Sequence, residues 1–382
     1  MKVRPKRFVL APDSFKESMT APEAVAAMER GIRAVFPDAE CVGVPMADGG
    51  EGTVDALVAA MGGEHVAVDV QDGRGRPVQA RYGLVAAENL AIVEISAAAG
   101  IDLVAGADRD PRLTSSFGVG QLIAAALDRG ARRFIVGLGG SVTNDGGSGM
   151  LQALGVRLLD ARGDELPGGG AALARLDRVD VAALDPRLAA ADFRIASDVT
   201  NPLLGPNGAS AIFGPQKGAS DAVVRELDAA LGVWSRIVAS TTGRDVATVP
   251  GSGAAGGLGF AFLAFFPAVV SRGVEVVMSA TQLADKIAGA DYVLTGEGSI
   301  DSQTAAGKTP LGVVEAAALH GVPVIAFAGR IGVGAEIACS MGFTALVPII
   351  QGISDLPRAL ADGPLNLERA VATACRLLAL QG

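Results

Sequence analysis

Residues 7–44, RFVLAPDSFKESMTAPEAVAAMERGIRAVFPDAECVGV, form a stretch that predicts a strand, a helix and a second strand. Both ends of this stretch are short and apolar, as the strands of a buried parallel sheet are. Between them, Thr20 and Glu23 have the spacing of a capping box and Pro22 stands in the first turn, which predicts a helix over residues 22–36. A start of this kind is typical of an α/β fold.

The same alternation continues to the end of the chain. Strands are predicted at residues 8–11, 41–44, 90–95, 134–137, 193–196, 292–295, 324–328 and 345–350, and further helices at 53–61, 119–129, 221–239, 258–270, 310–320 and 367–380. We expect doubly wound, mostly parallel sheets covered by helices. Because both chain ends have this character, we predict a discontinuous Rossmann-like domain from residues 1–70 and 290–382, into which a second α/β domain, residues 71–289, is inserted.

The composition excludes several classes of protein. Of 382 residues, 50% are hydrophobic and 19% charged, so the chain can bury a core and is neither disordered nor fibrous. The net charge of −9 argues against binding to nucleic acid or to an anionic membrane. The three cysteines are scattered, and neither of the two histidines is in a motif, which disfavours zinc and Ser-His-Asp chemistry. We therefore expect free thiols and a cytoplasmic protein.

Polar loops follow the first two predicted strands, where ligands of open α/β sheets bind. APDSFKES (residues 11–18) places an Asp, a hydroxyl and a Lys where they can position an anion, although a turn with solvated charges explains it equally well. In PMADGGEGT (residues 45–53), three glycines let backbone amides converge on a ligand. The acids Asp48 and Glu51 favour Mg²⁺ or a hydroxyl partner, with ordinary helix capping as the alternative.

Two further loops follow central strands. GLGGSVTNDGGSG (residues 137–149) has almost no apolar side chain and lacks the well-placed later acid of an NAD site, which favours a phosphate or substrate loop. SDVTNPLLGPNG (residues 197–208) places Asp198 after an apolar strand, where a carboxylate is costly unless it is used or paired. Asn201 can share a metal ion or an orienting hydrogen bond with Asp198.

The last polar loop is TGEGSIDSQTAAGKTP (residues 295–310). Its GKT invites a P-loop interpretation, but Ser302 stands where a P-loop needs glycine, so that interpretation is rejected. Lys308 and the amides of the following helix still suit a polyphosphate. GSGAAGGLG (residues 251–259) is either a ligand loop or a set of small residues that allow close helix packing. Together the loops offer carboxylates, lysines and amides without His or Cys, an inventory that suits phosphoryl transfer.

These motifs, taken in order, resemble those of bacterial glycerate kinases of the 2-kinase type. The resemblance runs from about residue 6 to 380 and is carried by APDSFKES (11–18), ADGGEGT (47–53), GLGGSVTNDGG (137–147), SDVTNPL (197–203) and TGEGSID (295–301). It implies ATP-dependent phosphorylation of D-glycerate to 2-phosphoglycerate, with Mg²⁺, in the cytoplasm. It also implies two α/β domains with the active site in the cleft between them.

For that implied reaction we assign hypothetical roles. Asp198 accepts the proton of the attacking hydroxyl or holds Mg²⁺ together with Glu51, and Lys16 neutralises charge on the phosphoryl group or on the glycerate carboxylate. The predicted substrate-binding residues are Asp13, Ser14, Phe15, Asp48, Gly49, Gly50, Ser141, Asn144, Asp145 and Asn201. The predicted nucleotide-binding residues are Gly296, Glu297, Gly298, Asp301, Gly307 and Lys308.

Three alternatives stay open. A kinase that acts at O3 of glycerate, or on another small hydroxy acid, would carry the same loops. A non-catalytic small-molecule sensor would be expected to lose its strand-end carboxylates, yet Asp13, Asp48, Asp198 and Asp301 are all present. We expect a monomer or a homodimer.

Overall fold

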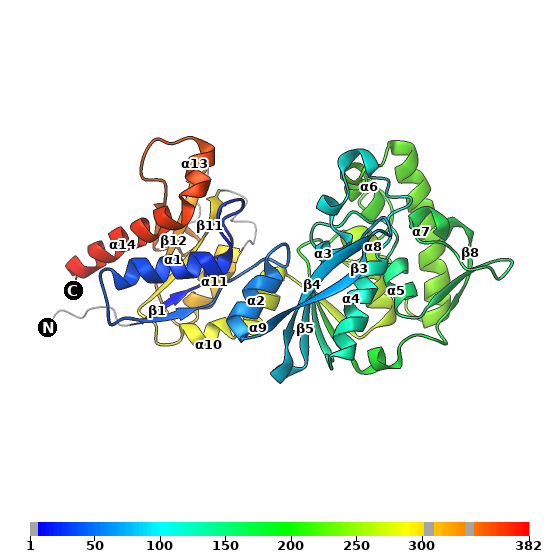
Figure 1. Ribbon diagram of the computed structural model, residues 1–382, viewed down its shortest axis with the longest axis horizontal. Coiled ribbons are helices and arrows are strands. Elements are labelled where there is room, and N and C mark those ends of the chain that lie inside the picture. The colour runs from blue at the N-terminus through cyan, green and yellow to red at the C-terminus, as the bar shows by residue number, and fades with distance from the viewer. Residues whose placement is uncertain (1–6, 302–308, 333–339, 382) are drawn as a thin grey trace. The chain divides into compact units, whose positions relative to one another are not determined.

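The computed structural model describes residues 7–301, 309–332 and 340–381, and it divides the chain into two compact units (Figure 1). Unit 1 comprises residues 1–48, 55–62 and 274–382, and unit 2 comprises residues 49–54 and 63–273. Both are built of strands alternating with helices, and their sheets are mostly parallel, which confirms the predicted α/β class. The chain passes between the two units mainly at residues 62/63 and 273/274, whereas the sequence analysis placed the domain boundaries at 70/71 and 289/290.

Unit 1 contains a five-stranded parallel sheet in the order β13-β12-β11-β1-β2. Its strands are β1 (Arg7–Leu10), β2 (Glu40–Gly43), β11 (Tyr292–Ile300), β12 (Val324–Ile331) and β13 (Ala345–Pro348). Its helices are α1 (Ala21–Arg33), most of α2 (Thr53–Met61) and of α9 (Gly273–Thr281), α10 (Leu283–Ile287), α11 (Thr309–Ala318), α13 (Leu356–Ala361) and α14 (Gly363–Gln381).

Helix α1 begins at the predicted capping box. Thr20 Oγ1 accepts from the Glu23 N–H at 3.3 Å, and Glu23 Oε2 accepts from the Thr20 N–H at 2.8 Å. The apolar face of α1 includes Met28 and Ile32, which pack with Val371 of α14 in the core of unit 1. The two helices lie side by side in Figure 1.

Strand β11 is longer than predicted. The sequence ended this strand at residue 295 and continued with a loop, but β11 pairs with β12 as far as Ile300. Gly296, Glu297 and Gly298 are therefore strand residues. A Cβ at Gly296 would lie 2.3 Å from the Phe327 carbonyl oxygen of β12, so glycine is needed there for the close approach of two backbones.

Unit 2 contains a six-stranded sheet in the order β10-β9-β6-β5-β4-β3, in which β5, β6, β9 and β10 are parallel and β3-β4-β5 are antiparallel. Its strands are β3 (Glu64–Gln71), β4 (Pro77–Val85), β5 (Leu90–Glu94), β6 (Arg133–Gly137), β9 (Asp192–Ala196) and β10 (Ala268–Ser271), with a separate hairpin of β7 (Arg157–Asp160) and β8 (Leu176–Asp180). Its α-helices are α3 (Ser96–Ala99), α4 (Phe117–Asp128), α5 (Ser148–Ala153), α6 (Ala209–Phe213), α7 (Asp221–Thr242) and α8 (Ala254–Phe265). Short 3₁₀ helices are η1 (Ala86–Glu88), η2 (Ile101–Leu103), η3 (Gly106–Asp108), η4 (Gly170–Arg175), η5 (Pro186–Ala190) and η6 (Pro215–Lys217).

The predicted helix over residues 258–270 is wrong in its last part. Helix α8 ends at Phe265, because Pro267 disfavours helical backbone at Phe266, whose φ of −125° and ψ of 162° are extended. Residues 268–271 then pair with β9 as the edge strand β10. Although α8 lies in an uncharged stretch, none of the described helices is long and apolar enough to cross a membrane.

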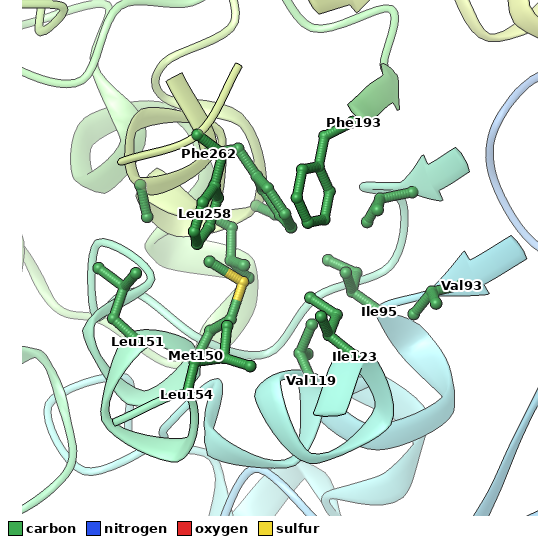
Figure 2. Close-up of a cluster of buried hydrophobic side chains, with 14 of the residues drawn as sticks. Val93, Ile95, Val119, Ile123, Met150, Leu151, Leu154, Phe193, Leu258 and Phe262 are labelled. Carbon is green, nitrogen blue, oxygen red and sulfur yellow. The ribbon is translucent and has the colours of Figure 1, made fainter. Parts of the chain in front are cut away.

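The core of unit 2 lies between its sheet and the helices α4, α5 and α8. Figure 2 shows Ile123 of α4, Met150 of α5 and Phe262 of α8 converging on Phe193 of β9. The ring of Phe193 also stacks on Phe134 of β6 with 4.8 Å between the ring centroids. Close packing of this kind fixes the parallel strands in place. It therefore also fixes the positions at which their polar loops begin.

Candidate active site

In unit 1, three acidic side chains lie near the carboxyl ends of adjacent strands. The sheet places β2 on one side of β1 and β11 on the other, so the strand order reverses at β1. Ligands of open α/β sheets bind beyond the strand ends at such a reversal. Asp13 follows β1, Asp48 follows β2, and Glu297 lies in β11. We call these three residues the unit 1 centre.

Asp13 is partly buried and is held by two hydrogen bonds. Its Oδ2 accepts from Thr309 Oγ1 and its Oδ1 accepts from the Ser14 N–H, each at 2.6 Å. Burial raises the pKa of Asp13 to about 7, and repulsion from Asp48 and Glu297 adds to the increase against the lowering effect of Thr309. The Asp13 carboxyl therefore exchanges its proton near neutral pH.

The other residues of the first motif have different surroundings. Ser14 is partly buried, and Lys16 is exposed. Phe15 is 2% exposed and belongs to the core of unit 1. Its predicted contact with a substrate stays a prediction, but its packing in the core already explains an aromatic residue here.

Residues 49–54 belong to unit 2 and cover the ends of its strands. Gly49 has a φ of +86°, and a Cβ there would lie 2.8 Å from the Ala196 Cβ at the end of β9. The Val54 N–H donates to Glu94 Oε1, at the end of β5, at 2.8 Å. Gly49 is therefore required for close backbone packing, whether or not it also binds a ligand. Glu51, the predicted second metal ligand, is exposed.

A buried lysine holds the loop after β6. Lys217 of η6 is 1% exposed, and its Nζ donates to Ser141 Oγ at 2.8 Å and to the Thr143 carbonyl oxygen at 2.6 Å. Burial lowers the pKa of Lys217 to about 7, and the Asp145 carboxylate opposes that shift. Lys217 was not among the predicted site residues. Its only signal in the sequence is its place between glycines and a proline in the segment GPQKG (residues 214–218).

The other two predicted residues of this loop are fully buried. Asp145 Oδ2 accepts from the Ser116 N–H and Oγ, each at 2.8 Å, and from the Gly149 N–H at 3.2 Å, while Oδ1 accepts from the Gly147 N–H at 3.1 Å. Asp145 thus joins the starts of α4 and α5, and burial raises its pKa. Asn144 Nδ2 donates to Ser210 Oγ at 2.9 Å.

Asp198 lies two residues beyond β9, where it was predicted. Its side chain is exposed, and its Oδ1 accepts from the Gly273 N–H at 3.1 Å. The Asn201 Nδ2 donates to the Asn207 carbonyl oxygen at 2.8 Å, and its predicted sharing of a metal ion or hydrogen bond with Asp198 stays a prediction. No group of three His, Cys, Asp or Glu side chains suited to a metal ion occurs among the described residues. Mg²⁺ is usually held by only one or two carboxylates together with substrate phosphates, so the predicted role of Asp198 as a metal ligand stays a prediction.

The glycines of residues 251–259 pack against the loop after β6. A Cβ at Gly256 would lie 2.0 Å from the Thr143 carbonyl oxygen, and the Gly146 N–H donates to the Gly256 carbonyl oxygen at 2.9 Å. Of the two interpretations of this segment, the structure therefore supports close packing. In the last predicted motif, Asp301 directly follows β11, and Gly307 and Lys308 lie outside the described residues.

Carboxylates and lysines at the strand ends of α/β units are typical of enzymes that transfer phosphoryl groups. The model of the glycerate kinase family matches residues 8–379. The chain is 47% identical to a glycerate kinase from Halalkalibacterium halodurans over 95% of both chains, and 45% identical to a glycerate 2-kinase from Escherichia coli over 98% of both. It also matches a crystal structure from Salmonella typhimurium that carries the name glycerate kinase 2, with a TM-score of 0.89 and 44% identity over 99% of this chain and 98% of that one.

The protein is therefore a kinase. It belongs to the glycerate kinase family, as its motifs indicated.

Proposed function

We propose that this protein transfers the γ-phosphoryl group of ATP to the O2 hydroxyl of D-glycerate, so that 2-phosphoglycerate and ADP form. The observation that carries this proposal is the similarity, over 98% of both chains, to a relative named glycerate 2-kinase. The strand-end carboxylates support it, because phosphoryl transfer needs a group that receives the hydroxyl proton and groups that position the phosphates.

In this proposal Asp198 accepts the proton of the attacking O2 hydroxyl or, alternatively, holds Mg²⁺ with Glu51. When bound, the ion would neutralise negative charge on the phosphates. Lys16 neutralises charge on the γ-phosphoryl group or the glycerate carboxylate. The glycerate contacts are proposed for Asp13, Ser14, Phe15, Asp48, Gly49, Gly50, Ser141, Asn144, Asp145 and Asn201, and the nucleotide contacts for Gly296, Glu297, Gly298, Asp301, Gly307 and Lys308.

The test is ADP release from ATP, Mg²⁺ and D-glycerate, with the product passed to enolase without phosphoglycerate mutase. Immediate turnover by enolase is the expected result, since enolase uses 2-phosphoglycerate. ADP release that feeds enolase only after mutase is added would make the protein a 3-kinase. No ADP release with D-glycerate would contradict the proposal, and a panel of other small hydroxy acids would then identify the substrate. The cytoplasmic location and the choice between monomer and homodimer stay predictions.

A further inference from the structure

The ammonium group of Lys217 is buried where a charge is costly unless its N–H groups find acceptors. Lys217 is 1% exposed, and both acceptors of its Nζ, Ser141 Oγ and the Thr143 carbonyl oxygen, belong to the loop after β6. Burial lowers the pKa of Lys217 to about 7, the Asp145 carboxylate opposes that shift, and both hydrogen-bond acceptors are neutral, so a lysine buried here needs a reason. Through these two hydrogen bonds, Lys217 holds the loop around Ser141 in its conformation.

The Lys217 contact also determines how the Ser141 hydroxyl is used. When Lys217 is protonated its ammonium group only donates, so Ser141 Oγ then accepts from it and directs its own hydrogen elsewhere. In the part of the chain that the structure describes, the Ser141 hydroxyl donates to no acceptor, although Ser141 is only 6% exposed. A buried hydroxyl normally finds an acceptor. Because the preceding residue, Gly140, is exposed, a small ligand can approach this part of the loop from solvent.

Two neighbouring side chains also have unused hydrogen-bonding capacity. Thr143 and Asn144 are both 0% exposed, and among the described residues Thr143 Oγ1 and Asn144 Oδ1 have no hydrogen-bond partner. Three polar side chains within four residues of the loop that Lys217 contacts therefore have hydrogen-bonding capacity that no described residue uses. Such a concentration points to a polar ligand or to ordered water at this loop.

We propose that Lys217 is a positioning residue for the acid substrate. Its ammonium group holds the Ser141 hydroxyl so that the hydrogen of Ser141 is donated to a carboxylate oxygen of a small hydroxy acid. This inference rests on the proposed function, which supplies such a substrate. The positive charge of protonated Lys217 favours an anion beside Ser141. A hydrogen bond from the Ser141 hydroxyl to a carboxylate is also charge-assisted.

The test compares Ser141→Ala, Ser141→Thr, Lys217→Met and the double variant Ser141→Ala/Lys217→Met in the full-length enzyme. We expect Ser141→Ala and Lys217→Met each to raise the KM for D-glycerate by about 10-fold or more, while the KM for ATP changes by less than about 3-fold. Ser141→Thr retains the hydroxyl but adds a methyl group at a buried position, so it should raise the KM for D-glycerate by clearly less than Ser141→Ala does. Because Lys217 acts through Ser141, the double variant should resemble Ser141→Ala, with less than about 3-fold added.

Fluorescence of Trp234 separates positioning from folding, because Trp234 Nε1 donates to the Gly146 carbonyl oxygen of the same loop at 3.0 Å. Wild-type emission with the KM changes above supports the inference. If Lys217→Met fails to fold, the two Ser141 variants decide, since an unchanged glycerate KM in Ser141→Ala overturns it. Equal increases of both KM values, or multiplied effects in the double variant, overturn it as well. A wild-type enzyme that phosphorylates no D-glycerate would overturn the proposed function and this inference together.

Discussion

At the residue scale, Asp198 lies exposed two residues beyond β9, and its Oδ1 accepts from the Gly273 N–H. We predict that Asp198→Asn lowers kcat by roughly 10²–10⁴-fold, whether the carboxylate accepts a proton or binds Mg²⁺. ADP release under saturating ATP and Mg²⁺ measures the loss, and Trp234 emission checks that unit 2 is folded. The matched control is Asp177→Asn, at an exposed position of β8, which should keep wild-type turnover. Near-wild-type turnover by Asp198→Asn would contradict both roles.

The raised pKa of Asp13 predicts that the free energy of unfolding of the protein depends on pH. Its pKa is raised from 3.8 to about 7 by burial, so the unfolded chain releases this proton near pH 4 and the folded protein only near pH 7. The stabilisation that comes from protonated Asp13 is complete below pH 4 and is lost as the pH rises through 7. Asp13→Asn should therefore gain roughly 1–3 kcal/mol relative to wild type between pH 4 and pH 8, after allowance for partial exposure.

Urea unfolding followed by circular dichroism at pH 4, 6 and 8 measures this difference, because the only tryptophan lies in unit 2. The exposed residue Asp38 offers the control variant Asp38→Asn within unit 1. A difference between Asp13→Asn and wild type that is the same at all three pH values would show that Asp13 ionises normally.

At the scale of elements, the segment of residues 49–54 contains two glycines with the same backbone conformation and different surroundings. Gly49 and Gly52 have φ values of +86° and +90°, but a Cβ at Gly49 would lie 2.8 Å from the Ala196 Cβ, whereas nothing lies within 4 Å of one at Gly52. Both alanine variants carry backbone strain of about 1 kcal/mol. We predict that Gly49→Ala destabilises unit 2 by roughly 1–3 kcal/mol more than Gly52→Ala does.

Urea unfolding followed by Trp234 fluorescence compares these two variants, since Trp234 is fully buried in unit 2. Equal losses of stability would mean that residue 49 has more room than its contact with Ala196 indicates.

Most elements around the central strands were predicted from their sequence patterns, and the exceptions share a physical reason. The eight predicted strands correspond to β1, β2, β5, β6, β9, β11, β12 and β13. Strands β3, β4, β7, β8 and β10 were not predicted. Strand β3 alternates exposed residues with Val66, Val68 and Val70, which are buried or partly buried, and β10 follows a helix after only a proline and one extended residue. Pairing with a neighbouring strand, which is not local, stabilises these segments.

At the scale of the whole molecule, the division into units predicts that unit 2 folds by itself. Residues 49–273 contain its complete six-stranded sheet and its core, including Trp234. We predict that a fragment of residues 49–273 unfolds cooperatively in urea, with the blue-shifted emission of a buried tryptophan. Emission of a solvent-exposed tryptophan in the absence of urea would show that unit 2 needs the rest of the chain. The full-length protein is the reference for both the emission wavelength and the transition.

The sequence by itself determined the α/β class, the capped first helix, most of the central strands and the family. These features depend on local sequence patterns and on long sequence motifs, which can be recognised without a structure. Only the tertiary structure decided which polar residues are buried and what they contact. Lys217 was not among the predicted site residues, and Thr309 was noted only as part of a rejected P-loop pattern, yet one holds Ser141 and the other holds Asp13. Burial and the resulting pKa values depend on segments that are distant in the chain, so no local pattern could reveal them.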